Sequence, residues 1–188
     1  MDEHDAVSPT VLLLVGGMNV HVCSKYRRDL WYGMVCMLDL DICVVTETWV
    51  KEGVNSVSKT IDPNKYAWFS RERQKQKAMS GEGGVGVLVK QSVGEVIVVD
   101  RSKDFDMMWI EISRPTCKIY LAAVYISPEG SPRASDSSIQ LAELEAKILH
   151  FKTKGQVIVL GGRSPLLYEM VVESFCQDLR KTLILAVL

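Results

Sequence analysis

Three polar residues of this sequence stand at or beside the ends of strand-like apolar runs, where a side chain could do chemistry. Asn19 ends the first run, Glu47 ends the second, and Tyr125 lies in a later run just before a Ser-Pro turn. Strand ends are where α/β folds present active-site groups. Glu47 is the most informative, because an unpartnered buried carboxylate is costly and a hard cation such as Mg²⁺ would offset that cost.

Each of the three also has a plainer interpretation. Glu47 can be a solvated residue at a strand end, and spacing alone supports this about as well as metal binding. Asn19 can be a turn residue that terminates a strand. Tyr125 can be structural, as a β-favouring aromatic residue beside a turn.

An apolar run over residues 156–160 leads into Gly161-Gly162-Arg163-Ser164. Many α/β enzymes display a catalytic carboxylate at such a place, and this chain has none there. Gly162 and Ser164 stand where we would look for an acid and an amide.

A basic cluster is the best local candidate for contact with a phosphate backbone, although charge runs are more often solvated loops. It consists of Arg71, Arg73, Lys75 and Lys77. Across all 188 residues the formal net charge is only -1, so there is no global basic excess that indicates nucleic acid.

The cysteines and the chain ends predict an intracellular protein, nuclear or cytoplasmic, without a membrane partner. The five cysteines are odd in number and form no C-x-x-C pair, which argues against a disulfide scaffold or a structural zinc site. The first residues are acidic where a signal peptide would be basic. The apolar runs are too short to span a bilayer.

We expect a tail over residues 1–10 and one domain over residues 11–188. The predicted strands cover 11–20, with a kink or bulge at Gly16-Gly17, and then 41–48, 66–70, 83–90, 94–99, 107–113, 118–126 and 156–160. The predicted helices cover 25–38, 136–152 and 167–179.

Apolar residues gather on one face of each of the first two helices. These faces are Leu30, Met34, Met37 and Leu38 in the first helix, and Leu141, Leu144, Ile148 and Phe151 in the second. In the second helix Glu143 also lies one turn before Lys147, the spacing of an ion pair.

The element order predicts an α/β (α+β) fold. Repeated strand–helix–strand units would indicate a doubly wound parallel sheet. The run of strands between residues 66 and 126 instead indicates an antiparallel meander. A mixed sheet, or two packed sheets with flanking helices, fits better.

Several short motifs, taken in order, resemble the endonuclease/exonuclease/phosphatase superfamily. The closest likeness is to the apurinic-type endonuclease domain of non-LTR (LINE-type) retrotransposons. The motifs are Met18-Asn19-Val20, Val44-Val45-Thr46-Glu47-Thr48-Trp49, Gly83-Gly84-Val85-Gly86-Val87-Leu88-Val89, Met108-Trp109-Ile110-Glu111-Ile112, Val124-Tyr125-Ile126-Ser127-Pro128 and Val157-Ile158-Val159-Leu160-Gly161.

The resemblance implies a four-layer sandwich of two mixed β-sheets flanked by helices, of which this chain would lack the last strands. It implies hydrolysis of phosphate esters with Mg²⁺ or Mn²⁺, and DNA as a candidate partner. Glu47 would be the metal ligand, Asn19 a polar neighbour in the same site, and Tyr125 a phosphate contact. Lost closing strands would expose a sheet edge and favour self-association.

Two departures from the family predict impaired or absent catalysis. The family has Gly-Asp-Phe-Asn where this chain has Gly161-Gly162-Arg163-Ser164, and its later Ser-Asp-His segment has no counterpart up to Leu188. A general base contributes about 10²–10⁴-fold in rate, and a charge-stabilising group contributes a comparable factor. Metal binding would be weak.

Three alternatives stay open. The chain can be a non-catalytic module on the same fold that binds nucleic acid or protein. It can be a phosphatase of the same superfamily. It can also be the product of a decaying reading frame, without a function.

Overall fold

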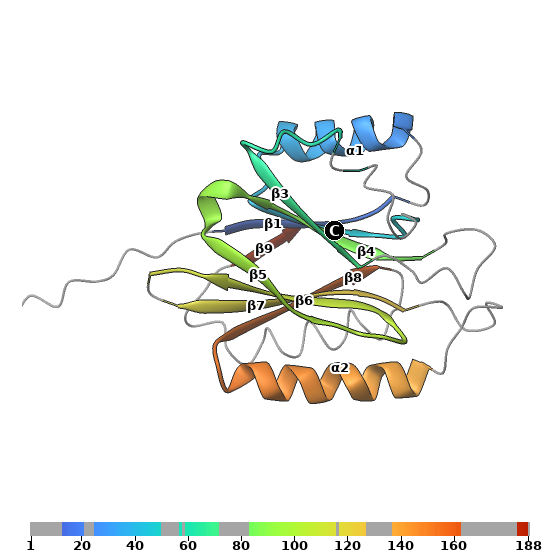
Figure 1. Ribbon diagram of the computed structural model, residues 1–188, viewed down its shortest axis with the longest axis vertical. Coiled ribbons are helices and arrows are strands. Elements are labelled where there is room, and N and C mark those ends of the chain that lie inside the picture. The colour runs from blue at the N-terminus through green and yellow to red at the C-terminus, as the bar shows by residue number, and fades with distance from the viewer. Residues whose placement is uncertain are drawn as a thin grey trace, which may run out of the picture.

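Two β-sheets pack face to face between two helices, which gives the four layers seen in Figure 1. This computed structural model describes residues 13–20, 25–49, 57, 59–71, 83–115, 117–126, 137–162 and 184–187. The α/β sandwich expected from the sequence is therefore confirmed. The predicted helix over 167–179 lies outside the described residues.

The first sheet has the strand order β3-β4-β2-β1-β9. Strands β1 and β2 are parallel and are joined by helix α1, while β4 runs antiparallel to both β2 and β3. The register of β1 with β2 passes through Gly16 and Gly17 without a shift, so the predicted bulge is absent. The bounds are β1 (Leu13–Asn19), α1 (Lys25–Met37), β2 (Ile42–Thr46), β3 (Tyr66–Arg71), β4 (Val85–Lys90) and β9 (Ile184–Val187).

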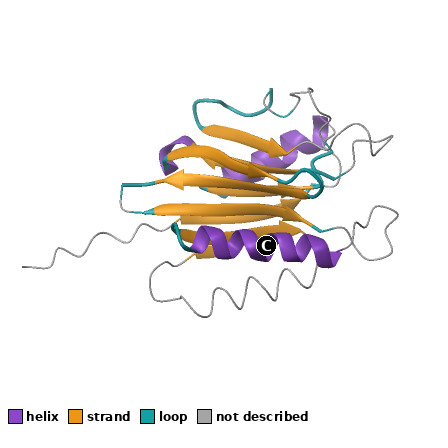
Figure 2. Ribbon diagram, turned by 60° about the horizontal axis from the view of Figure 1, so that its bottom comes forward, coloured by secondary structure: helices purple, strands orange, loops and turns teal. Residues whose placement is uncertain are grey.

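The second sheet has the strand order β5-β6-β7-β8. Strands β5, β6 and β7 form an antiparallel meander. The meander predicted over residues 66–126 is thus divided, because β3 and β4 pair in the first sheet. Strand β8 is parallel to β7 and is reached through helix α2, which lies along the outer face of this sheet in Figure 2. The bounds are η2 (Gln91–Val93), β5 (Glu95–Arg101), β6 (Asp106–Ser113), β7 (Lys118–Tyr125), α2 (Ser137–Lys152) and β8 (Gln156–Gly162).

Alternation along the strands divides the apolar residues among three cores, because successive side chains point to opposite faces of a sheet. Between the sheets lie Val15, Ile42, Val44 and Val87 from the first sheet and Met108, Ile110, Leu121 and Ile158 from the second. Under α1 lie Cys43, Val45 and Leu88, and under α2 lie Trp109, Tyr120, Ala122 and Val159. The sheets are therefore buried on both faces, which explains their nearly continuous apolar strands.

Helix α2 uses the face that the sequence predicts. Leu144, Ile148 and Phe151 are buried against the second sheet, with Leu141 packed partly buried beside them. An ion pair also links the helix to the sheet, since Lys147 Nζ lies 2.9 Å from Asp100 Oδ1 of β5. The sequence predicted an ion pair of Lys147 with Glu143, whereas the ion pair in the structure is with Asp100.

The predicted inner face of α1 is wrong. Leu30, Met34 and Met37 are 57%, 40% and 77% exposed, and Leu38 beyond the helix is 44% exposed. The helix instead buries Trp31 and Val35. Trp31 packs on Trp68 of β3, with ring centroids 5.9 Å apart, and this large contact sets which face turns inward.

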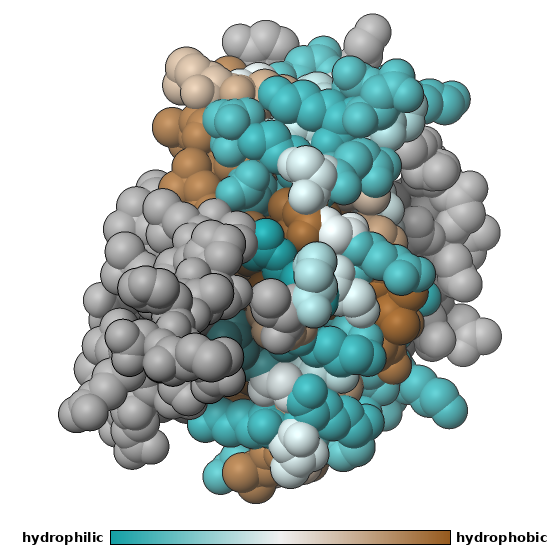
Figure 3. Space-filling model, turned by 90° about the vertical axis from the view of Figure 1, so that its left-hand side faces the viewer, coloured by the Kyte–Doolittle hydropathy of each residue, from teal (hydrophilic) through white to brown (hydrophobic). Residues whose placement is uncertain are grey.

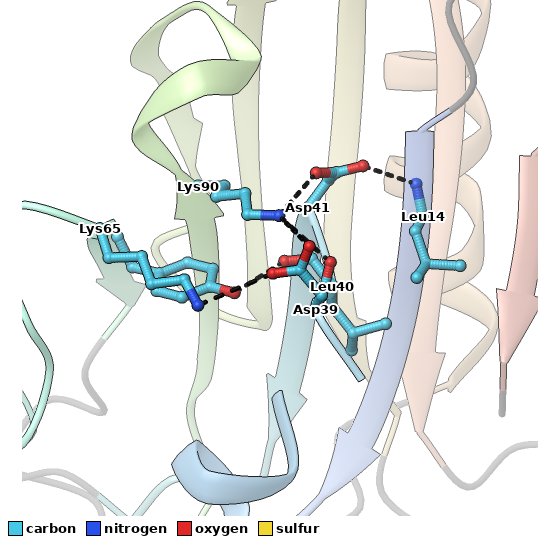
Figure 4. A network of polar contacts seen from close by, with 7 residues as sticks. Leu14, Asp39, Leu40, Asp41, Lys65 and Lys90 are labelled. Carbon is cyan, nitrogen blue, oxygen red and sulfur yellow. Dashed lines mark hydrogen bonds and ion pairs between the residues drawn. The ribbon is translucent and has the colours of Figure 1, made fainter. Parts of the chain in front are cut away.

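Ion pairs and a hydrogen bond join β1, β4 and the segment before β2 at the end of the first sheet where β1 and β2 begin (Figure 4). Asp41 Oδ2 accepts a hydrogen bond from the Leu14 amide at 2.9 Å, and Lys90 Nζ lies 2.9 Å from Asp39 Oδ2 and 3.4 Å from Asp41 Oδ1. The hydrogen bond and charge of Lys90 lower the pKa of the Asp39 carboxyl. The described surface at this end is mainly hydrophilic (Figure 3).

The strands at the sheet edges, among the described residues, are β3 and β9 in the first sheet and β5 and β8 in the second. Self-association through such an edge stays a prediction. Within the same described part of the chain, neither helix is long and apolar enough to cross a membrane.

Candidate functional site

Two of the predicted site residues meet at the end of the first sheet. Because β1 and β2 are parallel neighbours, Asn19 is the register partner of Thr46, and the Val20 amide donates to the Thr46 carbonyl at 3.1 Å. Glu47 follows directly. The Asn19 side-chain amide donates from Nδ2 to Glu47 Oε1 at 3.1 Å, while the Glu47 residue is only 3% exposed.

Glu47 has a backbone conformation that non-glycine residues rarely adopt, with φ of +55°. The turn after it is held by β4, since the Thr48 amide donates to the Gly84 carbonyl at 3.3 Å and the Trp49 amide donates to the Gly83 carbonyl at 2.9 Å. This left-handed turn ends the alternation of β2 at Glu47. Such strain persists only where the surroundings enforce it, and it is concentrated at functional sites.

Gly84 makes this turn possible. Its φ is +85°, and a Cβ atom on it would lie 2.7 Å from Thr48 Oγ1. Gly83 and Gly84 both have positive φ and form the turn that enters β4, which supports the loop that carries Glu47.

Tyr125 and Gly162 end two neighbouring strands of the second sheet. They are register partners in the parallel pair β7–β8, and Asp106 at the start of β6 is the partner of Tyr125 on the other side. Tyr125 is 9% exposed and belongs to the core between the sheets. By alternation from Ile158 and Leu160, Gly162 falls on the same face. Ser164 lies outside the described residues.

Arg71 joins the two sheets at this same end. From the last position of β3, its Nε and Nη2 donate to the carbonyls of Ser102 and Lys103, each at 2.9 Å. Its Nη1 lies 3.6 Å from Asp106 Oδ1, and the Arg71 side chain is buried while that of Asp106 is partly buried. The ends of the first-sheet strands, with Asn19 and Glu47, therefore lie at the same end of the sandwich as Tyr125 and Gly162.

The predicted basic cluster is thus divided. The guanidinium of Arg71 is engaged inside the fold, between the sheets, and the residue is 6% exposed. Arg73, Lys75 and Lys77 lie outside the described residues. Nothing in the local sequence distinguishes Arg71 from the other basic residues, because its partners come from the β5–β6 turn, about 30 residues later.

Two buried hydroxyls beside Glu47 were not predicted as site residues. Thr46 and Thr48 are 2% and 0% exposed, and neither Oγ1 atom has a hydrogen-bond partner within the part of the chain that the structure describes. An unsatisfied buried hydroxyl costs about 1–3 kcal/mol. The Thr-Glu-Thr sequence is the only local signal, and it resembles an ordinary β-branched strand.

The described donors match a cation that keeps several waters rather than a tightly chelated metal. Among the described residues no group of three or more His, Cys, Asp or Glu side chains could hold a metal ion. The end of the first sheet offers the carboxylate of Glu47, which accepts a hydrogen bond from Asn19. Mg²⁺ is often bound through one or two carboxylates and keeps several waters.

Comparisons with known proteins identify the fold. No protein-family model and no curated protein sequence matches the chain. The D. rerio TDP2 structure complexed with single-strand DNA product has a TM-score of 0.58 and 15% identity, over 85% of this chain and 64% of that one. The endonuclease domain of TRAS1, a telomere-specific non-LTR retrotransposon, has a TM-score of 0.57 and 11% identity, over 86% of this chain and 70% of that one.

An endonuclease/exonuclease/phosphatase family protein from Bacteroides thetaiotaomicron has a TM-score of 0.58 and 14% identity, over 86% of this chain and 67% of that one. The chain therefore shares its fold with these structures, among them an endonuclease/exonuclease/phosphatase family protein, as the resemblance implied. The chain spans less than two thirds of the length of the TDP2 chain.

Proposed function

We propose that this chain is a retrotransposon-derived, endonuclease-like domain of the Mg²⁺-dependent phosphodiesterase superfamily, with impaired or absent catalysis. The observation that carries the proposal is the Asn19–Glu47 pair, in which a buried carboxylate in a strained turn accepts a hydrogen bond from a neighbouring strand end. The proposed domain covers residues 11–188.

Each residue has a proposed role in binding a phosphate ester. Glu47 holds Mg²⁺ or Mn²⁺, and Asn19 orients its carboxylate through the hydrogen bond to Oε1. Tyr125 contacts a phosphate oxygen from the end of β7. When bound, the cation supplies Lewis-acid polarisation of the phosphate.

Gly162 is the reason to propose impaired catalysis. It ends β8 beside Tyr125, where the resemblance places the acid that activates water, and glycine cannot take a proton. Without a general base the rate falls by about 10²–10⁴-fold. Binding of the cation by Glu47 does not depend on that acid.

The test separates binding from turnover in the full chain. Mg²⁺ and Mn²⁺ are titrated while thermal unfolding is followed, and supercoiled and abasic DNA are assayed for nicking. We expect weak, saturable stabilisation by the cation, which Glu47→Gln abolishes, and no nicking above that of Glu47→Gln. Glu95→Gln, an exposed position on β5 that changes the net charge equally, is the matched control and should behave like wild type.

Different results would contradict the metal-binding role of Glu47 and the impaired catalysis. If the wild-type chain gains no stability from either cation, the metal-binding role of Glu47 is wrong. If the wild-type chain nicks DNA with turnover and Glu47→Gln abolishes that activity, the impairment is wrong.

A second candidate is a non-catalytic module that binds nucleic acid, favoured by the fold shared with the DNA-complexed TDP2 structure. Arg73, Lys75 and Lys77 would then contact phosphates, and Arg71 would serve the fold. Replacing the three by Gln should weaken binding to single-stranded DNA and lower the salt slope of binding by roughly 0.7 per lost contact. The control replaces the exposed Lys59, Lys152 and Lys154. No detectable binding at low salt excludes this candidate.

A further inference from the structure

The threonines on either side of Glu47 have buried hydroxyls, Thr46 Oγ1 and Thr48 Oγ1, that lack a hydrogen-bond partner among the described residues. The large majority of buried polar side-chain atoms in folded proteins have a partner, which can be protein or ordered water. An orphaned hydroxyl beside a buried carboxylate therefore calls for an explanation. The two hydroxyls differ in where they lie.

Packing against Gly84 explains why the Thr48 hydroxyl is buried. Its Oγ1 lies where it would be 2.7 Å from a Cβ atom on Gly84, so it fills the space that this glycine leaves. Its amide donates to the carbonyl of the same glycine. Its hydroxyl is thus enclosed by the turn that supports Glu47.

Thr46 lies on the face where the site forms. It shares a side of β2 with Ile42 and Val44, whose side chains fill the space between the sheets. Its register partner is Asn19, which donates to Glu47 Oε1. The orphaned hydroxyl of Thr46 therefore stands at the polar end of the inter-sheet space, beside the one hydrogen-bonded pair on which the proposed function depends.

We propose that the Thr46 hydroxyl belongs to the cation site, as a hydrogen-bond partner of a water molecule that the cation carries. This inference rests on the proposed role of Glu47 in metal binding and adds a second residue to it. A hydroxyl both donates and accepts, so it can accept from a metal-bound water. Mg²⁺ loses its waters reluctantly, and with a single carboxylate ligand the contacts to those waters supply much of the affinity.

The proposal also accounts for the burial of this hydroxyl. No protein group of the described residues pairs with the Thr46 hydroxyl, and a buried hydroxyl left unpaired destabilises a fold. With the cation and its waters bound, the hydroxyl is satisfied. Removing it should therefore have opposite effects on the metal-free fold and on metal binding, which a purely structural threonine would not show.

The experiment compares three variants of the full chain by calorimetric titration with Mn²⁺ alone and by thermal unfolding in a chelator. Thr46→Val keeps the shape and removes the hydroxyl. We expect a higher Tm in chelator and a Mn²⁺ affinity lowered by about tenfold, the equivalent of about 1.4 kcal/mol. Thr46→Ser keeps the hydroxyl and should bind Mn²⁺ nearly as wild type does.

Thr48→Val is the matched control. It removes the other orphaned hydroxyl next to Glu47 and should raise the Tm without changing the Mn²⁺ affinity. Should Thr46→Val fail to fold, the pair Thr46→Ser and Thr46→Cys makes the same comparison, because the thiol is a weak hydrogen-bond partner of similar size. Weaker Mn²⁺ binding by the cysteine variant supports the proposal.

Two results overturn the inference while the proposed function stands: wild-type Mn²⁺ affinity in Thr46→Val, or equal losses of affinity in Thr46→Val and Thr48→Val. A wild-type chain that does not bind Mn²⁺ overturns the inference and the proposed metal role of Glu47 together.

Discussion

Arg71 and Asp106 connect the two sheets at the end of the sandwich where Asn19 and Glu47 lie. The two side chains are 7% and 11% exposed, and the Nη1–Oδ1 distance is 3.6 Å. The same guanidinium donates to two backbone carbonyls of the segment before β6. This contact sets how the strand ends of one sheet face those of the other.

Removing Arg71 should be costly to stability. Arg71→Ala leaves the Asp106 carboxylate and two carbonyls without that partner, and breaking a buried ion pair costs about 3–5 kcal/mol. Arg101→Ala is the control, because this exposed arginine makes a 3.3 Å hydrogen bond to the Ser70 carbonyl. Its loss should cost less than about 1 kcal/mol in urea unfolding. Equal losses in the two variants would show that the Arg71 contact is not a structural tie.

The face of α1 gives a second prediction. Trp31→Ala should lower the free energy of unfolding by about 3–5 kcal/mol, because the indole is 2% exposed and packs on Trp68. The adjacent Leu30→Ala should change it by no more than about 0.5 kcal/mol, since Leu30 is 57% exposed. Chemical denaturation measures both. A larger loss of unfolding free energy for Leu30→Ala than for Trp31→Ala would support the inner face predicted from the sequence.

Glu111 gives a prediction about pH. The hydrogen bond from Lys118 Nζ is the largest cause that lowers the pKa of the Glu111 carboxyl in the folded chain. A lowered pKa stabilises the fold fully above the ordinary glutamate pKa of about 4.3, and this contribution is lost as the pH falls through the lowered value. Glu111→Gln should therefore reduce stability more at pH 7 than at pH 3.

Urea unfolding of wild type and Glu111→Gln at the two pH values measures this difference. Glu95→Gln, which removes an exposed carboxylate, is the control. A destabilisation by Glu111→Gln that is as large at pH 3 as at pH 7 would rule out the carboxylate charge as its source.

Gly162 gives a prediction about the missing acid. Gly162→Asp places a second carboxylate beside Tyr125, on the face between the sheets, and should raise the affinity for Mn²⁺, because affinity follows ligand charge. Cleavage should not return, even when Ser164→Asn is added, because the late histidine implied by the resemblance has no counterpart in the 188 residues. Measurable nicking by the double variant contradicts this expectation.

Most strands and the inner face of α2 could be predicted from the sequence, and the inner face of α1 could not. Apolar runs with turn signals between them located β1 to β8, because sheets covered on both faces need continuous apolar strands. Strand β9 was not predicted. In α1, apolar residues occur on nearly every side, from Leu30 through Leu38. Periodicity cannot choose among such faces, and the contact of Trp31 with Trp68 decides.

The candidate site could be predicted in its residue types but not in its contacts. Asn19 and Glu47 were marked by their places at strand ends, yet their hydrogen bond depends on the parallel pairing of β1 with β2. Thr46 looked like an ordinary strand residue, since a missing partner can be recognised only when the surroundings are known.

The network of Asp39, Asp41 and Lys90 has a consequence for how this chain can evolve. It fastens the strands at the end opposite Asn19 and Glu47, so the register of the first sheet does not depend on the polar residues of the candidate site. Natural proteins tolerate substitutions that stay above a threshold of stability. Substitutions of Asn19 or Glu47 can therefore accumulate without loss of the pairing of β1 with β2, so mutational drift at one end of the first sheet would leave the other end intact.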